Sequence, residues 1–273
     1  MEDKQGNALM PLEVDILEFV VPVENNKTLL IWDIEPSLTA AQIHVALCQV
    51  FSTFGPLYLV KVCPNAPVAS PGFYAIIKFY SAAQASKAQR QTDGQMLFQT
   101  SPLKVRLSSR QTPSTLSRST RLLSHTHCLD LANHCLGFNS WSSHVITLKE
   151  LSDDDDEELL DGQRRFRFCC LIQLTFPHHG QTTRGVAVVE DTFMDTGPEL
   201  VLQKRGKLQK SVREEALVQA FSTVLLVLLG NRKVMVEVKQ NSNQFLHELT
   251  EGAMQVNEWQ PDVDDDLEEQ RQP

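Results

Sequence analysis

The sequence predicts an α+β protein with two consecutive modules, because two groups of strand-like and helix-like segments follow one another. In the first group, over residues 25–110, the order of elements is βαββαβ. In the second group, over residues 125–240, the order is α-β-β-β-α with an added strand. The clearest strand is GFYAIIKF at residues 72–79, which alternates an apolar face with a face that carries Tyr74, Ile76 and Lys78.

The elements of the first module follow from apolar periodicity and from the residues at helix ends. A helix over residues 37–54 would begin with Ser37 as its N-cap and end at Gly55, and a second helix is expected over residues 81–90. Antiparallel strands are expected at residues 27–34, 57–63, 72–79 and 103–107.

The exposed face of this sheet has the composition of a surface that binds single-stranded nucleic acid. An aromatic ring can stack on a base, and a cation can neutralise a phosphate. The alternative is that Tyr74 is only a half-buried residue of a structural strand. The candidate binding residues are Leu30, Trp32, Lys61, Tyr74, Ile76, Lys78, Lys104, Arg106 and, just beyond the last strand, Arg110.

Two stretches of the first module resemble the signatures of the RNA-recognition motif (RRM). GFYAIIKF resembles the longer signature, and LLIWDI at residues 29–34 resembles the shorter one. The resemblance implies a four-stranded sheet whose open face binds RNA or single-stranded DNA. Because Leu30 and Ile76 stand where the family usually has aromatic residues, only one or two rings would stack, at ~1–3 kcal/mol per base.

The net charge of −9 is concentrated in two stretches. Residues 149–161 carry −7 and residues 258–273 carry −6, which leaves +4 for the rest of the chain. The overall acidity therefore does not exclude a phosphate-binding surface. By composition we expect an N-terminal extension (1–24), a Ser/Thr/Arg linker (111–124), an acidic insert (152–161) and an acidic, disordered tail (241–273).

The second module begins with a predicted helix over residues 124–136 that ends at Gly137. A long helical segment over residues 199–229, interrupted at Gly206, follows three strands. Its apolar end, residues 224–229, would offer a surface for subunit contacts. The strands are expected at residues 144–151, 165–176, 184–190 and 233–239.

This module resembles the Rad fifty-two family of recombination mediators, which anneal complementary single strands. The stretches that carry the resemblance are LANHCLGFNSW (131–141), FRFCCLIQLTF (166–176) and RGVAVVED (184–191). An RRM joined to this module resembles the family of Rad fifty-two motif-containing proteins. The resemblance implies the fold of the single-strand-annealing core and a contribution to DNA binding, to self-association or to both.

The candidate residues of the second module are of two kinds. Three match the family motif: Phe138, Asn139 and Trp141. They either contact a nucleic-acid strand or pack the corner between the helix and the following β-strand. Five are cations that either hold phosphates or form a solvated helix face: Lys204, Arg205, Lys207, Lys210 and Arg213. A basic pair of the family that faces DNA aligns with the uncharged Val218 and Gln219, so we expect weak annealing.

No sequence motif predicts catalysis. The patterns G-x-S-x-G and H-E-x-x-H and a phosphate-binding loop are absent from the sequence, so we expect no enzyme and no cofactor. The histidines and cysteines of residues 125–135 are explained by one helix, and we expect no metal site. We also expect a soluble intracellular protein with no membrane contact and no small-molecule substrate.

The predicted function is non-catalytic binding of single-stranded DNA and RNA in the DNA-damage response and recombinational repair. The expected location is the nucleus, with room for a cytoplasmic pool. A homo-oligomer and repair-protein partners are expected. The alternative is a protein-interaction scaffold that uses the RRM face and the second module, since apolar patches rimmed by charge often bind partners.

Overall fold

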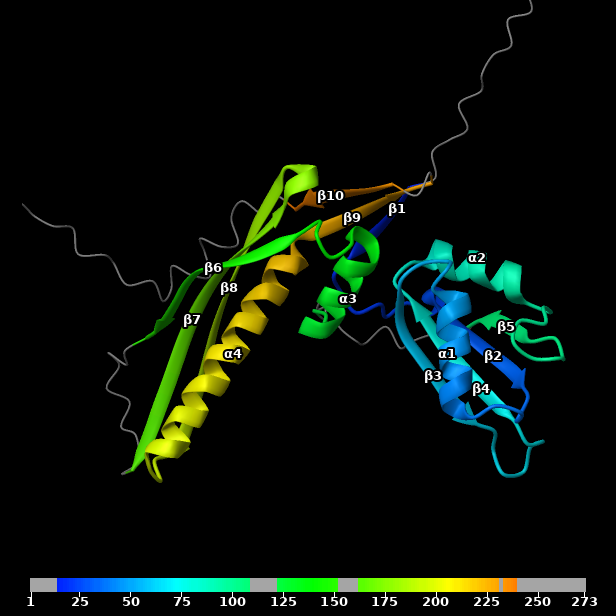
Figure 1. The fold of residues 1–273 in the computed structure, drawn as a ribbon, viewed down its shortest axis with the longest axis horizontal. Helices are drawn as coiled ribbons and strands as arrows, with labels where there is room; N and C mark the ends of the chain where they lie inside the picture. Colours follow the sequence, from blue (N-terminus) through cyan, green and yellow to red (C-terminus); the bar gives the residue numbers. More distant parts are fainter. Residues whose placement is uncertain (1–13, 109–121, 152–161, 231–232, 240–273) are drawn as a thin grey trace, which may run out of the picture. The chain divides into compact units, whose positions relative to one another are not determined.

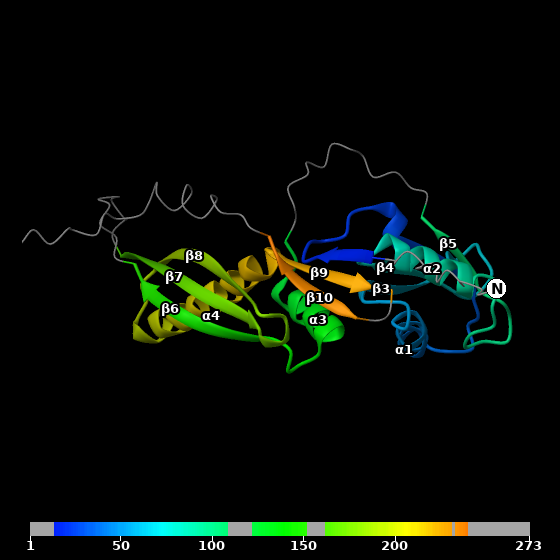
Figure 2. The same ribbon diagram turned by 90° about the horizontal axis from the view of Figure 1, so that it is seen from above.

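The computed structural model describes residues 14–108, 122–151, 162–230 and 233–239, which form three antiparallel sheets and four α-helices (Figures 1 and 2). The predicted α+β class with antiparallel sheets is confirmed. Arg110, most of the linker, the acidic insert and the acidic tail lie outside the described residues.

The first sheet is four-stranded and shows the predicted βαββαβ order of elements. Its strands are β2 (Thr28–Ile34), β3 (Leu57–Pro64), β4 (Phe73–Phe79) and β5 (Lys104–Leu107), in the spatial order β3-β4-β2-β5. Helices α1 (Ala40–Phe51) and α2 (Ala82–Thr92) pack on one face of it. That face supplies the core residues Leu29, Ile31, Ala75, Ile77 and Phe79, all fully buried.

The first helix begins two residues later than the sequence indicated. Its N-cap is Thr39, whose side chain accepts a hydrogen bond from the Gln42 amide while the Gln42 side chain accepts one from the Thr39 amide. This capping box needs a Gln or Glu three residues after the cap, and Ser37 has an alanine there. The N-cap prediction at Ser37 is therefore wrong.

The second sheet is built from two long strands and one shorter one. It contains β6 (Ser142–Glu150), β7 (Gln163–Phe176) and β8 (Gln181–Met194), in that spatial order, with a short 3-10 turn over Pro177–His179 between β7 and β8. Alternate residues of β7, from Phe166 to Phe176, are buried. They pack with α3 (His125–Leu136) and α4 (Pro198–Ser222) in one apolar core.

Two predictions about the long helical segment are wrong. Helix α4 runs through Gly206 without interruption, because a glycine within a helix costs only about 1 kcal/mol and removes no backbone donor. The residues after Thr223 are not helical but form strand β9 (Val224–Leu229). Pairing with two neighbouring strands outweighs the helical periodicity of this leucine-rich run.

The N-terminal extension supplies a strand to the third sheet. Strand β1 (Val14–Glu18) and strand β10 (Val234–Val238) pair antiparallel with the two edges of β9. Leu17 and Phe19 are buried, and the Phe19 ring stacks on Phe221 with a centroid distance of 4.8 Å. The second module therefore includes a segment that precedes the RRM in the chain.

Among the residues that the structure describes, no helix has the length and apolar character needed to cross a membrane.

The packing of α4 on β8 requires Gly185. A Cβ atom at this position would clash with the carbonyl oxygen of Ala216 and the amide nitrogen of Ala220, both in the α4 backbone. We expect Gly185→Ala to lower the free energy of unfolding by about 1–3 kcal/mol or more. Gly206→Ala is the matched control, because a Cβ there meets no atom within 4 Å and should stabilise by up to about 1 kcal/mol. Urea denaturation measures both, and equal stability of the two variants would contradict this packing.

Candidate nucleic-acid interface

The register of the first sheet places its exposed side chains in rows. Leu30 of β2 lies opposite Ile76 of β4 and opposite Arg106 of β5, and Ile76 lies opposite Lys61 of β3. The first row therefore runs Lys61, Ile76, Leu30, Arg106. The row has an apolar centre with a cation at each end. This pattern suits a single-stranded nucleic acid whose bases lie over the sheet and whose phosphates reach the edges of the sheet.

The second row carries the aromatic residues. Tyr74 lies opposite Cys63, and Trp32 lies opposite Lys104. Tyr74 is 38 % exposed, and a side-chain hydrogen bond with Cys63 raises the pKa of the tyrosine. The structure thus brings the predicted residues of all four strands to one face. Cys63 was not predicted, although its position two residues after Lys61 in a strand could have indicated it.

Lys78 is less available than its position in the sequence suggested. Its Nζ atom donates a hydrogen bond to the Pro22 carbonyl at 2.9 Å. Burial lowers the pKa of Lys78; the charge of Glu24 partly opposes this effect, and the charge of Lys27 adds to it. A lysine that is held in this way contributes little to a phosphate contact.

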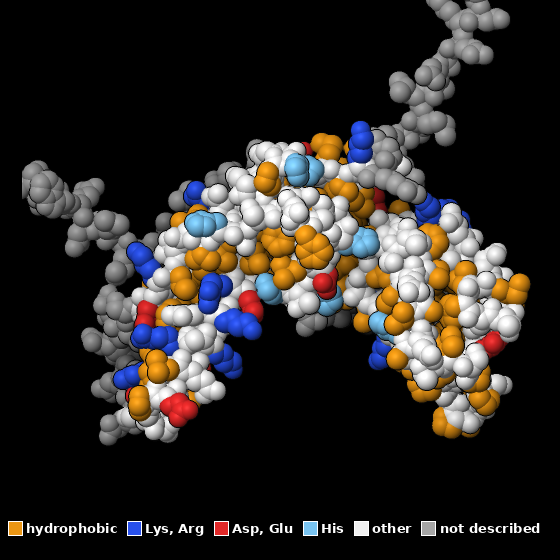
Figure 3. Space-filling view, viewed as in Figure 1, with side chains coloured by type: hydrophobic (Ala, Val, Ile, Leu, Met, Phe, Trp, Pro, Cys, Tyr) orange, Lys and Arg blue, Asp and Glu red, His pale blue; other side chains and the backbone are white. Residues whose placement is uncertain are grey.

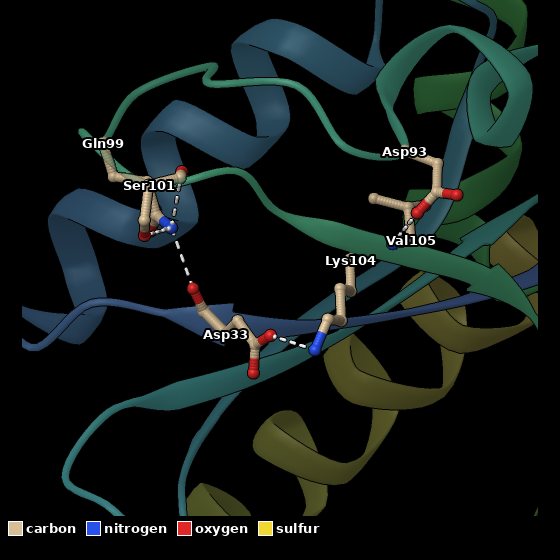
Figure 4. Close-up of polar contacts among 6 residues, drawn as sticks. All are labelled: Asp33, Asp93, Gln99, Ser101, Lys104 and Val105. Atoms are coloured by element: carbon tan, nitrogen blue, oxygen red, sulfur yellow. Dashed lines mark hydrogen bonds and ion pairs between the residues drawn. The ribbon is translucent and has the colours of Figure 1, made fainter.

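The two cations of β5 are paired with acids. Lys104 Nζ lies 2.9 Å from Asp33 Oδ2 (Figure 4), and Arg106 Nη1 lies 2.6 Å from Asp93 Oδ2. Both side chains of the first pair and the Arg106 side chain of the second are exposed, so each pair contributes little to stability and a phosphate can compete with the acid. Lys61 is exposed, and none of the ion pairs of the described residues involves it.

The motif residues of the second module differ in exposure. The Trp141 indole donates a hydrogen bond to Asn133 Oδ1 at 3.0 Å, and its ring packs edge-on against Phe221 at 5.3 Å. Trp141 therefore holds the helix–strand corner. Phe138 is 82 % exposed and Asn139 is also exposed, so both are available to a partner.

Figure 3 shows Lys and Arg side chains gathered over the region where Figure 1 draws α4, and the cations of this helix have different partners. Lys204 pairs with Asp191 at 2.8 Å, and Arg205 pairs with Glu150 at 2.9 Å. Each also lies over a ring of the sheet, Phe193 and Phe166 respectively. These two cations fix the helix to the sheet.

The remaining three cations of α4 are exposed to solvent. Lys210 lies 3.8 Å from Glu214 one turn later, and Arg213 donates to the backbone carbonyl of Gln209. Lys207 is also exposed. Val218, aligned from the sequence with a DNA-facing basic residue, is buried in the core of the module. A buried residue cannot contact a phosphate, so phosphate contacts from α4 would come from its upstream half.

Most of the chain is similar to known proteins. It is 51 % identical to RAD52 motif-containing protein 1 of Danio rerio over 91 % of this chain and 90 % of that protein. It is 39 % identical to the Homo sapiens protein of the same name, over 84 % and 82 %. Residues 123–225, which span α3 to the start of β9, match a family described as the RDM1 DSRM domain. Among solved structures, the Mip6 RRM3 domain is 20 % identical, covering 32 % of this chain and 99 % of that one with a TM-score of 0.27.

The different environments of Lys61 and Lys78 predict different salt dependences. We expect Lys61→Ala to reduce the slope of log affinity against log salt by about 0.7 for a single strand, because one phosphate contact is lost. Lys78→Ala, a lysine-to-alanine change on the neighbouring strand, should leave the slope nearly unchanged. Fluorescence anisotropy at several salt concentrations measures both slopes. A larger effect of Lys78→Ala would mean that nucleic acid displaces the Pro22 carbonyl.

Proposed function

The chain belongs to the family of RAD52 motif-containing protein 1, and on this basis we propose that it binds single-stranded DNA and RNA without catalysing a reaction and acts in recombinational repair. The resemblance drawn from the RRM signatures and from LANHCLGFNSW is confirmed at the level of the family. The observation that carries the proposal is the pair of rings, Tyr74 and Trp32, on an open sheet face with cations at its edges. The proposed role is in the DNA-damage response, and the proposed location is the nucleus.

The proposed contact is stacking on the sheet with neutralisation at its rim. One base stacks on Tyr74 and another on Trp32, while Leu30 and Ile76 form the apolar floor beside them. Lys61 and Arg106 lie at opposite ends of one row and take phosphates. Two stacks at ~1–3 kcal/mol each predict a modest affinity for the isolated face, so a second contact is needed for tight binding.

The second module is proposed to supply that contact. Lys207, Lys210 and Arg213 are exposed on α4 and can hold phosphates without reading sequence. Domains of the kind named for residues 123–225 recognise double-stranded RNA by shape and backbone contacts. We propose that α4 contacts the backbone of a duplex next to the single strand on the RRM face.

The stacking role of Tyr74 is tested by removing its ring. Tyr74→Ala should weaken binding of single-stranded RNA and DNA by about tenfold to a hundredfold without unfolding the protein, because Tyr74 lies on the exposed face. Tyr74→Phe keeps the ring and should bind like the native protein. Isothermal titration with short oligonucleotides measures the three affinities. Equal affinities for all three proteins would show that the stacking surface lies elsewhere.

A second candidate function is self-association through the outer face of the β1-β9-β10 sheet. Ile16 and Met235 both lie opposite Val227, so the three side chains share one face, and the first two are 56 % and 45 % exposed. The neighbouring Val14 is 51 % exposed. Strands β1 and β10 are the edges of this sheet. An apolar face of this kind can be covered by the same face of a second copy, because apolar contact has no direction.

Self-association is tested on the full chain, since residues 120–240 alone would lack β1. Ile16→Glu should convert a dimer to a monomer at micromolar concentration, because the new charge would be buried between the copies. Val45→Glu, a change of the same kind on α1 at a residue 54 % exposed, is the control and should have no effect. Light scattering gives the mass, and a native protein that is monomeric throughout would exclude this function.

A further inference from the structure

Strand β2 contains a bulge in the middle of the candidate interface. Ile31 pairs with Ala75 and Ile34 pairs with Phe73, so Trp32 and Asp33 together lie opposite the single residue Tyr74. Ile31 and Ile34 are both buried. The two residues between them therefore lie on the exposed side, and a bulge of this kind changes the direction of a side chain next to a binding surface.

The backbone of Asp33 adopts an unusual conformation. Its φ is +64°, which among the described residues is the one positive value outside glycine. Such a conformation persists where the surroundings hold it in place. Here the Gln99 side chain donates to the Asp33 carbonyl at 2.8 Å (Figure 4). It also accepts from the Glu35 amide at 3.0 Å, so it bridges both sides of the bulge.

The bulge presents a carboxylate and an ammonium group side by side next to Trp32. Asp33 Oδ2 lies 2.9 Å from Lys104 Nζ, and Lys104 lies opposite Trp32 in the sheet. The two side chains are 49 % and 62 % exposed, so both can still bond to a ligand. A carboxylate on a phosphate-binding face repels phosphate, whereas it accepts hydrogen bonds from the N–H groups of a base.

We infer that Asp33 and Lys104 form a subsite that recognises guanine in a single strand. Guanine is the natural base that offers two adjacent N–H donors, N1 and N2, on its Watson–Crick edge, followed by the O6 acceptor. The Asp33 carboxylate accepts from both donors, and the Lys104 ammonium donates to O6. Adenine, cytosine and uracil direct an acceptor lone pair towards the carboxylate at one of these positions. In single strands this edge is open to readout, and Trp32 supplies the ring on which the base stacks.

This inference rests on the proposed function and names the base that the RRM face prefers. The plainer role of the pair is to hold the bulge, as an exposed ion pair that contributes little energy. The two roles differ in what they predict for ligands. A structural pair affects all single strands equally, whereas a base-reading pair affects strands that contain guanine.

The experiment measures base preference with the full chain and uridine-rich RNA strands of one length. Each strand carries one central guanosine, adenosine, cytidine, uridine or inosine. We expect the guanosine strand to bind about tenfold more tightly than the adenosine, cytidine and uridine strands. Inosine lacks the N2 amino group and should fall in between. Deoxyribose strands should show the same ranking, because the contacts do not involve the sugar.

Asp33→Asn is the informative variant, because asparagine also tolerates the left-handed conformation but has a single side-chain acceptor. Its preference for guanosine should fall to about twofold, with affinity for the all-uridine strand retained. Asp93→Asn is the matched control. It makes the same change in the acid that pairs with Arg106, and Arg106 lies on strand β5 together with Lys104. It should keep the native ranking of bases, and thermal melting checks that both variants are folded.

The outcomes separate the inference from the proposed function. Native protein that binds every strand with equal affinity would overturn the guanine subsite and leave single-strand binding intact. A uniform loss over all strands in Asp33→Asn would assign the residue to the structure of the bulge and would also overturn the subsite. A native protein that binds no single strand would overturn the proposed function itself.

Discussion

The packing of the sheet against α1 and α2 in one apolar core is the interaction on which the candidate interface depends. Ile31 of β2 and Ile77 of β4 are fully buried in the same core as Leu47 of α1 and Ala85 of α2. Because successive side chains of a strand point to opposite sides, burial of these residues forces their neighbours onto the open face. A shift of one residue in β4 would bury Tyr74 and expose Ile77, so the register that stabilises the fold is the register that displays the ring.

The cations of both modules look alike in the sequence but have two kinds of role. Some hold elements of the fold together, and others are exposed to solvent. Lys204 and Arg205 each combine an ion pair with a contact to an aromatic ring, which fixes α4 on its sheet. Lys61 and Lys207 are simply exposed. Counting cations on a face therefore overstates the charge that a phosphate meets, since an acid or a carbonyl already satisfies several of them.

The third sheet joins parts of the chain that are far apart. Strand β9 lies between β1 and β10, and the residues of β1 and β9 are separated by more than the whole RRM. Closing so large a loop costs conformational entropy, which the burial of Leu17, Phe19 and Leu226 offsets. The same arrangement explains why the apolar run after Thr223 is extended, since a strand between two partners satisfies both of its backbone edges.

The sequence by itself determined the α+β class, the order of the RRM elements and the two faces of β4, because the alternation of apolar residues is local and depends on no distant contact. It also determined the beginnings of α2 and α3, where Ser81 and Ser124 cap their own helices. Only the tertiary structure decided that Lys78 is held by Pro22, that Val218 is buried and that β1 belongs to the second module. It alone placed Asp33 in a bulge beside Lys104. Each of these features depends on a partner from another part of the chain, and periodicity within one segment carries no information about that partner.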